Sequence, residues 1–256
     1  MSRLFELQNA SFSYRGETQT KVLERFNFVL DRGERLAIFG PNGCGKTTLL
    51  YILAGFLPLE VQQGCFKRRE ARLAFVFQDY SRSLFNWFSV EKNLGLAMDS
   101  HTSQAALKFR LSSLLGEAMP PWLLSVMDRY PYELSGGQRQ ILCLIRAILS
   151  KPDLLLLDEP FSSLDVTHKV MAIRLVTKLA EQSNTTWVAI SHNLDDCLLT
   201  ADRVLAMQGP PLTLAQSVSV PVGWPRTHEV LLSPEFKRAR DKIYESTWKE
   251  TPPREQ

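Results

Sequence analysis

The chain has few cysteines and no long hydrophobic run, and each absence excludes a class of protein. Its 256 residues include only four cysteines, none of them at CxxC spacing, and a chain of this size does not need a disulfide scaffold. No window approaches the roughly 20 apolar residues of a membrane-spanning helix. The N-terminal residues contain no apolar stretch of signal-peptide length. We therefore expect a cytosolic protein with reduced thiols, which reaches a membrane only through a partner.

Neither sign of charge is in marked excess. The 30 basic and 27 acidic residues give a formal net charge of +3. Binding to nucleic acid or to lipid through charge requires clustered charge, so this balance neither indicates nor excludes either ligand. Hydrophobic residues make up 45% of the chain, enough to bury a substantial core.

Short apolar runs alternate with helical segments along most of the chain. Residues 4–14 and 25–30 partly alternate, as half-buried antiparallel strands do. Continuous apolar runs, which are typical of a parallel sheet covered on both faces, occur at residues 36–39, 73–77, 154–157, 186–190 and 204–207. We expect an α/β fold with a parallel-sheet core and an N-terminal antiparallel β subdomain.

Two further regions differ from this pattern. Residues 79–134 are helical, with Leu107, Leu111, Leu114 and Leu115 spaced for one face, which predicts an inserted helical subdomain. Beyond residue 208 the signal weakens: we expect a C-terminal extension over 209–256, with a helix from about 233 to 246 and a disordered tail. Residues 1–208 would then form the main domain.

A glycine-rich loop follows the apolar run 36–39 and precedes a helical stretch over 47–54. It matches GxxxxGK[ST] in full, with the residues Gly40, Pro41, Asn42, Gly43, Cys44, Gly45, Lys46 and Thr47. The glycines allow backbone N–H groups to turn toward phosphate oxygens, and the helix adds its positive N-terminal end. We expect Lys46 to reach the β- and γ-phosphates of a nucleotide and Thr47 to bind Mg²⁺.

Two carboxylates follow the buried strand predicted at 154–157. Ligands of open α/β sheets collect at the carboxyl ends of the strands. Asp158 is therefore a candidate Mg²⁺ ligand, and Glu159 is a candidate base for the attacking water.

A second candidate anion site lies at Ser135, Gly136, Gly137 and Gln138. Ser135 is a good helix N-cap, and the glycines leave the first-turn N–H groups unobstructed. The following residues 141–145 are apolar almost all round, so the helix should be buried. A second anion site implies either another ligand or another copy of the chain.

The ordered strings GPNGCGKTT, LSGGQ, LLLLDEP and SH resemble the ABC ATPases over most of residues 1–208. In that family two cassettes of the P-loop NTPase fold pack head to tail, and each ATP lies between the phosphate loop of one subunit and the LSGGQ of the other. The resemblance implies that residues 135–138 contact the γ-phosphate of the partner's ATP. Ile141 departs from the family pattern, which has a basic residue at that position.

The same resemblance gives roles to single residues. It implies that Tyr14 stacks on adenine, the less favoured alternative being a strand aromatic in the core, and that Thr48 extends the nucleotide-binding set. Gln78 would contact Mg²⁺ and the attacking water. Asp165 would signal across the dimer, and His192 would contact the γ-phosphate. His101, His168 and His228 lack such placement and are expected to be surface residues.

Residues 77–87 and 130–133 further resemble the ATPases of nitrate, sulfonate and taurine importers. This implies a homodimer at the cytoplasmic face of the inner membrane, bound to permease subunits that a solute-binding protein supplies, and no nucleic acid. The aromatic residues Tyr80, Phe85, Trp87 and Phe88 are either permease contacts or the core of the insert. Alternatives are the motor of an exporter or a soluble ABC ATPase acting on DNA or ribosomes.

Overall fold

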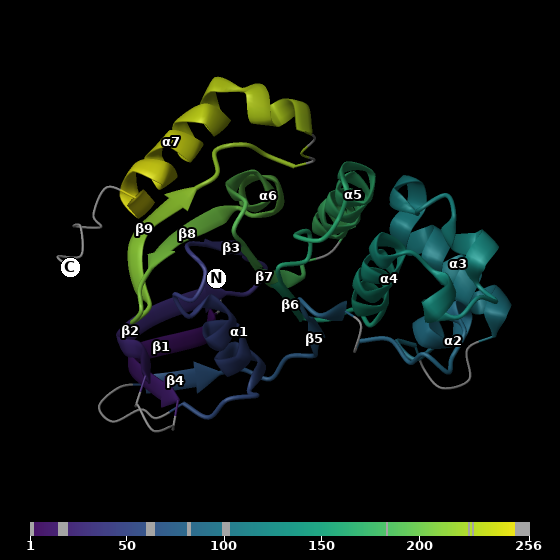
Figure 1. Ribbon diagram of the computed structural model, residues 1–256, viewed down its shortest axis with the longest axis horizontal. Coiled ribbons are helices and arrows are strands. Elements are labelled where there is room, and N and C mark those ends of the chain that lie inside the picture. Colours follow the sequence, from purple (N-terminus) through teal and green to yellow (C-terminus); the bar gives the residue numbers. More distant parts are fainter. Residues whose placement is uncertain are drawn as a thin grey trace. The chain divides into compact units, whose positions relative to one another are not determined.

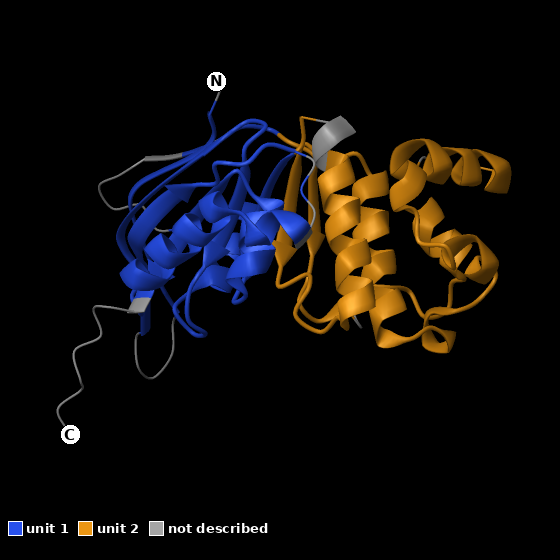
Figure 2. Cartoon of the chain, turned by 90° about the horizontal axis from the view of Figure 1, so that it is seen from above, with its two compact units in different colours: residues 1–70, 186–256 blue, residues 71–185 orange. Residues whose placement is uncertain are grey.

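The computed structural model describes residues 3–14, 20–59, 65–80, 83–98, 103–182, 184–224, 226 and 228–248. The predicted disordered tail, His101 and the side chain of His228 lie outside this description. The chain divides into two compact units, which Figure 2 colours separately: Met1–Glu70 with Thr186–Gln256, and Ala71–Thr185.

The first unit contains an antiparallel sheet in the order β2-β1-β4, formed by β1 (Arg3–Tyr14), β2 (Thr20–Asp31) and β4 (Cys65–Arg68). The two N-terminal strands pair from Arg3 opposite Asp31 to Tyr14 opposite Thr20, with several register shifts. Their burial alternates in part, as the sequence predicted, except that residues 4–7 of β1 are all buried.

A second group of strands in this unit surrounds β3 (Arg35–Phe39), which pairs in parallel with β7 (Thr186–Ser191) and β8 (Arg203–Gln208). Leu36, Ala37 and Ile38 have no exposed surface, as expected for a strand covered on both faces. The helices of the unit are α1 (Lys46–Ala54), α6 (Leu194–Thr200), the short 3-10 helix η5 (His228–Leu232) and α7 (Pro234–Trp248).

An additional strand, β9 (Thr213–Ser219), pairs antiparallel with β8. Sequence patterns do not predict this strand, because its residues are mostly polar, are only partly buried and lack the apolar alternation of a strand. The C-terminal helix α7 packs against β9 and β8 (Figure 1). The described residues 213–219 and 234–248 are therefore part of the packed unit.

The second unit pairs β5 (Leu73–Val76) in parallel with β6 (Leu154–Asp158), Leu73 facing Leu154. Its long helices are α4 (Gly136–Leu149) and α5 (Val166–Gln182), which pack together. The helical insert consists of α2 (Val90–Gly95), α3 (Gln104–Leu115) and the 3-10 helices η2 (Gly116–Ala118), η3 (Leu123–Val126) and η4 (Pro131–Glu133).

The predicted leucine face of the insert is largely the buried face of α3. Leu107, Leu111 and Leu115 are at most 2% exposed, whereas Leu114 is half-buried. Among the described helices, none combines the length and the apolar character that crossing a membrane requires.

Candidate nucleotide-binding site

The glycine loop of the first unit joins β3 to α1 and has the backbone of an anion cradle. Gly43 and Gly45 have φ values of 79° and 111°, which only glycine adopts at little cost. Gly45 is the N-cap of α1, no side chain caps that terminus, and its first turn has no acidic residue. The N-terminal N–H groups of α1 thus point to a site suited to a phosphate group.

The loop also supplies a buried positive charge. Lys46 is 6% exposed, and its Nζ donates to the carbonyl oxygens of Gly40 (2.9 Å) and Pro41 (2.8 Å). Carbonyl dipoles only partly balance an ammonium group, so phosphate oxygens are stronger partners for it. At Gly40 a Cβ would lie 2.5 Å from the carbonyl oxygen of Met207, so the loop is also packed tightly from behind.

Tyr14 lies beside the start of α1. Its hydroxyl is 3.1 Å from Thr48 Oγ1, and its ring meets Phe12 edge-on at 5.1 Å. The residue is 44% exposed, so the ring is not a core aromatic and its face can stack on a planar base.

His192 lies at an exposed turn directly after β7 in the same unit. The next residue, Asn193, caps α6 by accepting hydrogen bonds from the N–H groups of Asp195 and Asp196. The Ser191 hydroxyl accepts from the Asn193 N–H at 3.0 Å. These bonds fix the turn that presents the histidine at the carboxyl end of a parallel strand.

In the second unit, Asp158 is the last residue of β6 and Glu159 follows it; they are 2% and 8% exposed. Glu159 has a φ of 50°, a left-handed conformation that is rare for a residue other than glycine. Two hydrogen bonds stabilise the turn: the N–H and the hydroxyl of Ser162 both donate to the Glu159 carbonyl oxygen. Gln78 is exposed, two residues after β5.

The N-terminus of α4 carries the predicted cap. Ser135 Oγ accepts from the Gln138 N–H at 3.2 Å, while the Ser135 N–H donates to Gln138 Oε1 at 3.0 Å. Such a capping box leaves the hydroxyl proton of the serine and the amide NH₂ of the glutamine to face an anion. The body of α4 is buried from Gln140 to Ile145, as the sequence predicted.

The two glycines of this helix start also make room for neighbouring side chains. A Cβ on Gly136 would lie 2.8 Å from the Tyr80 hydroxyl, and one on Gly137 would lie 2.7 Å from the imidazole of His168. The sequence did not reveal these contacts, because Tyr80 and His168 are distant from the glycines along the chain.

His168 is not the plain surface residue expected from the sequence. Its side chain is only 20% exposed, and its Nδ1 is 2.7 Å from Asp165 Oδ2. The Asp165 carboxylate also accepts from the His168 N–H at 2.9 Å. Two hydrogen bonds from His168 lower the pKa of Asp165: the bond from the backbone N–H has the larger effect and the bond from the ring the smaller.

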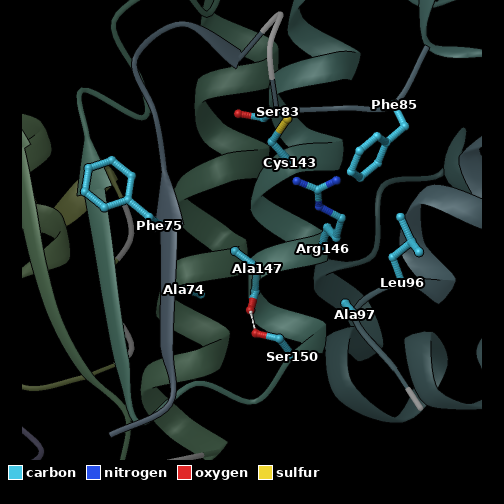
Figure 3. A pocket seen from close by; sticks show the side chains of 10 residues that line it. All are labelled: Ala74, Phe75, Ser83, Phe85, Leu96, Ala97, Cys143, Arg146, Ala147 and Ser150. Carbon is cyan, nitrogen blue, oxygen red and sulfur yellow. Dashed lines mark hydrogen bonds between the residues drawn. The ribbon is translucent and has the colours of Figure 1, made fainter. Parts of the chain in front are cut away.

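A pocket of about 270 Å³ opens elsewhere in the second unit (Figure 3). Its lining includes Phe85, Leu96, Cys143 and Arg146, and the Arg146 guanidinium lies 5.9 Å from the Phe85 ring centre. Burial lowers the pKa of Arg146. Phe85 and Leu96 are 40% and 53% exposed, so this surface combines apolar side chains with one cation.

The four aromatic residues that we expected to be either permease contacts or the core of the insert lie in two different places. Phe85, Trp87 and Phe88 form one ring cluster, and Trp87 is 70% exposed. Tyr80 instead lies against the start of α4, with the Arg139 guanidinium 5.9 Å from its ring centre. Phe85 and Trp87 are thus surface residues rather than the core of the insert.

A glycine loop between a buried parallel strand and an uncapped helix N-terminus defines the class of phosphate-binding α/β proteins. The family model of the ABC transporter ATP-binding domain matches residues 23–162. The chain therefore belongs to the ABC transporter family, and within it to the ATP-hydrolysing cassettes.

Curated relatives extend this match over most of the chain. The aliphatic sulfonates import ATP-binding protein SsuB of Bacillus licheniformis is 31% identical over 234 residues, which are 90% of this chain and 88% of that protein. The sulfate/thiosulfate import ATP-binding protein CysA of Pseudomonas aeruginosa is 36% identical over 79% of this chain. The match spans only 63% of the length of CysA.

A solved structure agrees with the fold. An inward-facing putative metal-chelate type ABC transporter aligns with a TM-score of 0.65 and 26% identity, covering 94% of this chain and 90% of that one. The α/β cassette fold expected from the sequence is thus confirmed.

Proposed function

We propose that this chain binds and hydrolyses ATP to drive an importer of a small anionic solute. The observation that carries the proposal is the N-terminus of α1, which no side chain caps. Beside it, the Lys46 ammonium group donates to the carbonyl oxygens of Gly40 and Pro41. The backbone of Gly40–Thr48 would cradle the triphosphate, and the exposed face of Tyr14 would stack on the adenine.

The acidic residues of the second unit fit the chemistry of the γ-phosphate. Thr47, Asp158 and Gln78 offer the oxygen ligands that Mg²⁺ prefers. The metal, when bound, would neutralise charge on the phosphate oxygens. Glu159 would accept a proton from the attacking water while the water oxygen bonds to the γ-phosphorus and the bond to ADP breaks. His192 would donate a hydrogen bond to the γ-phosphate.

The exposed start of α4 supports a head-to-tail homodimer. Ser135, Gly136, Gly137 and Gln138 form a second anion-binding helix terminus, and the family resemblance assigns it to the ATP held by the partner subunit. Asp165 lies in the loop that would meet the partner. Closure on two ATP molecules, hydrolysis and reopening would then move the permease between its states.

The pocket and the ring cluster near Phe85 support contact with a membrane permease. Exposed aromatic and aliphatic residues around a half-buried arginine are typical of an interface core. A short helix of the permease would fit this surface, which would hold the subunit at the cytoplasmic face of the membrane. A solute-binding protein would act on the permease and not on this chain.

The relatives narrow the class of solute. The names of both curated relatives specify sulfur oxyanions or organic sulfonates, so we propose a sulfonate, a sulfate or a similar solute such as nitrate or taurine.

The proposal is tested with Glu159→Gln. This variant should bind ATP as the wild type does but lose at least about 100-fold in turnover, because the water loses its base. ATP should also convert it to a stable dimer in light-scattering chromatography. The exposed Glu117→Gln provides the matched control and should hydrolyse ATP normally. Turnover of Glu159→Gln within about twofold of wild type would refute the role of Glu159.

A further inference from the structure

The imidazole of His168 lies between two functional segments of the second unit. One side of the ring rests on Gly137, where a Cβ would approach three ring atoms within 3.0 Å. Its Nδ1 is bonded to Asp165 Oδ2 at 2.7 Å. A carboxylate accepts only, so Nδ1 carries the proton in this bond. The ring therefore joins the start of α4 to the aspartate that precedes α5.

A second side chain makes a similar connection one turn further along α4. Gln140 is 3% exposed; its Nε2 donates to the Pro160 carbonyl oxygen at 2.6 Å, and its Oε1 accepts from the Ser163 hydroxyl at 2.7 Å. The segment from Glu159 to Asp165 is thus hydrogen-bonded to α4 through Gln140. At the end of the segment, Asp165 is bonded to His168, whose ring packs on Gly137 of α4. The two attachments restrict independent movement of this segment and the Ser135–Gln138 turn.

We propose that His168 is a positioning residue for ATP hydrolysis, which holds Asp165 in register with the Ser135–Gln138 turn of the same subunit. The inference rests on the proposed function, in which this turn binds the partner's ATP. When the turn engages that ATP, Asp165 and the segment that begins with Glu159 move with it. In this role His168 would act through Asp165 and the turn and would itself contact neither nucleotide nor metal.

Three substitutions separate the two contacts of the ring. His168→Ala removes both, His168→Phe keeps a ring for Gly137 but loses the donor, and His168→Asn keeps a donor near the Nδ1 position but loses the ring. Positioning through Asp165 predicts that kcat falls about tenfold in the alanine and phenylalanine variants. The asparagine variant should stay within about threefold of wild type, and KM for ATP should change by less than about twofold in all three.

A purely structural role predicts that the variants differ in stability, with phenylalanine closer to wild type than asparagine. Packing on Gly137 would be restored by phenylalanine and not by asparagine, and kcat per folded molecule would be unchanged. Thr167→Ala, an exposed neighbour of His168, is the matched control and should have wild-type kinetics. Wild-type kcat in His168→Ala, or rescue by phenylalanine alone, would overturn the proposal.

A measurement without catalysis tests the connection itself. In the chain labelled with ¹⁵N-glycine, Asp165→Asn should shift the amide resonance of Gly137, identified by its loss in Gly137→Ala. The shift should disappear when Asp165→Asn is made in the His168→Ala background. An unchanged shift in that background would overturn the connection. If the wild type failed to hydrolyse ATP, the proposed function would fail, while this measurement would still decide the role of His168 as a link.

Discussion

At the scale of single residues, neighbouring side chains determine what each functional position tolerates. Gly136 and Gly137 are bounded by Tyr80 and His168, so an alanine at either position requires those side chains to move. Lys46 is buried against loop carbonyls, and Glu159 has a left-handed backbone. The chemistry of these residues follows from their type, but their orientation follows from packing.

The buried cysteines should resist alkylation. Burial raises the pKa of Cys143 to about 12, so at pH 8 only about one thiol in 10⁴ is the reactive thiolate. Burial also raises the pKa of Cys44 in the phosphate loop, although Lys46 opposes the shift. Because the thiolate fraction grows with pH below the pKa, labelling of Cys143 should rise about tenfold per unit between pH 7 and 9.

This prediction is checked by iodoacetamide labelling and peptide mass spectrometry. Protein unfolded in guanidinium is the control, in which both cysteines should react quickly because an exposed thiol has a pKa of about 8.5. Equal labelling rates in the folded and unfolded protein would contradict the burial of these thiols.

At the scale of elements, loops and helix ends are fixed by hydrogen bonds that cross large distances in sequence. Arg226 is 4% exposed, and its guanidinium donates to the carbonyl oxygens of Leu198, Ala201 and Val222. The same group lies 4.4 Å from the ring centre of Trp224. Burial lowers the pKa of Arg226 to about 10, so it stays charged at neutral pH and fastens the segment after β9 to the end of α6.

Replacing this arginine should destabilise the fold. Arg226→Met removes the donors for three carbonyl groups, of which those of Leu198 and Ala201 are buried. The free energy of unfolding should therefore fall by about 3 kcal/mol. Arg238→Met is the matched control: the Arg238 side chain is 73% exposed and pairs with Glu235, so its loss should cost less than about 0.5 kcal/mol. Urea denaturation measures both values, and equal stabilities would contradict the anchoring role of Arg226.

At the scale of the whole molecule, each compact unit carries part of the functional machinery. The phosphate loop, Tyr14 and His192 belong to the first unit, whereas Gln78, Glu159 and the start of α4 belong to the second. The pocket beside Phe85 lies within the second unit. The unit that would bind the partner's nucleotide is thus also the unit that would contact the permease.

A charge placed in this pocket should disrupt assembly with the permease. Leu96→Asp places a carboxylate on the pocket lining and should reduce recovery of a co-expressed candidate permease by at least about tenfold, because moving a charge out of water into an apolar interface is costly. Phe109→Asp changes an apolar side chain that is 77% exposed and lies outside the lining, and should leave recovery unchanged. Co-purification from detergent extracts makes the comparison, and recovery with ribosomes or DNA instead would contradict the importer.

Local sequence patterns were sufficient to predict the class of fold, which the structure confirms, and to nominate most of the candidate site. The phosphate loop, the acidic strand end and the capped helix at Ser135 are local patterns, in which adjacent residues set the backbone and the chemistry together. The strand pattern was equally local and agreed with β1, β3, β5, β6, β7 and β8 to within a residue or two at most ends.

Contacts between residues distant in the chain could be identified only in the folded structure. It placed His168 on Gly137, bonded Gln140 to the segment after Glu159, and added the polar strand β9 and the Arg226 anchor. A polar edge strand lacks the apolar alternation that sequence patterns detect. A buried arginine or histidine is recognised only by its partners, because burying a polar group is tolerated where hydrogen bonds replace those of water.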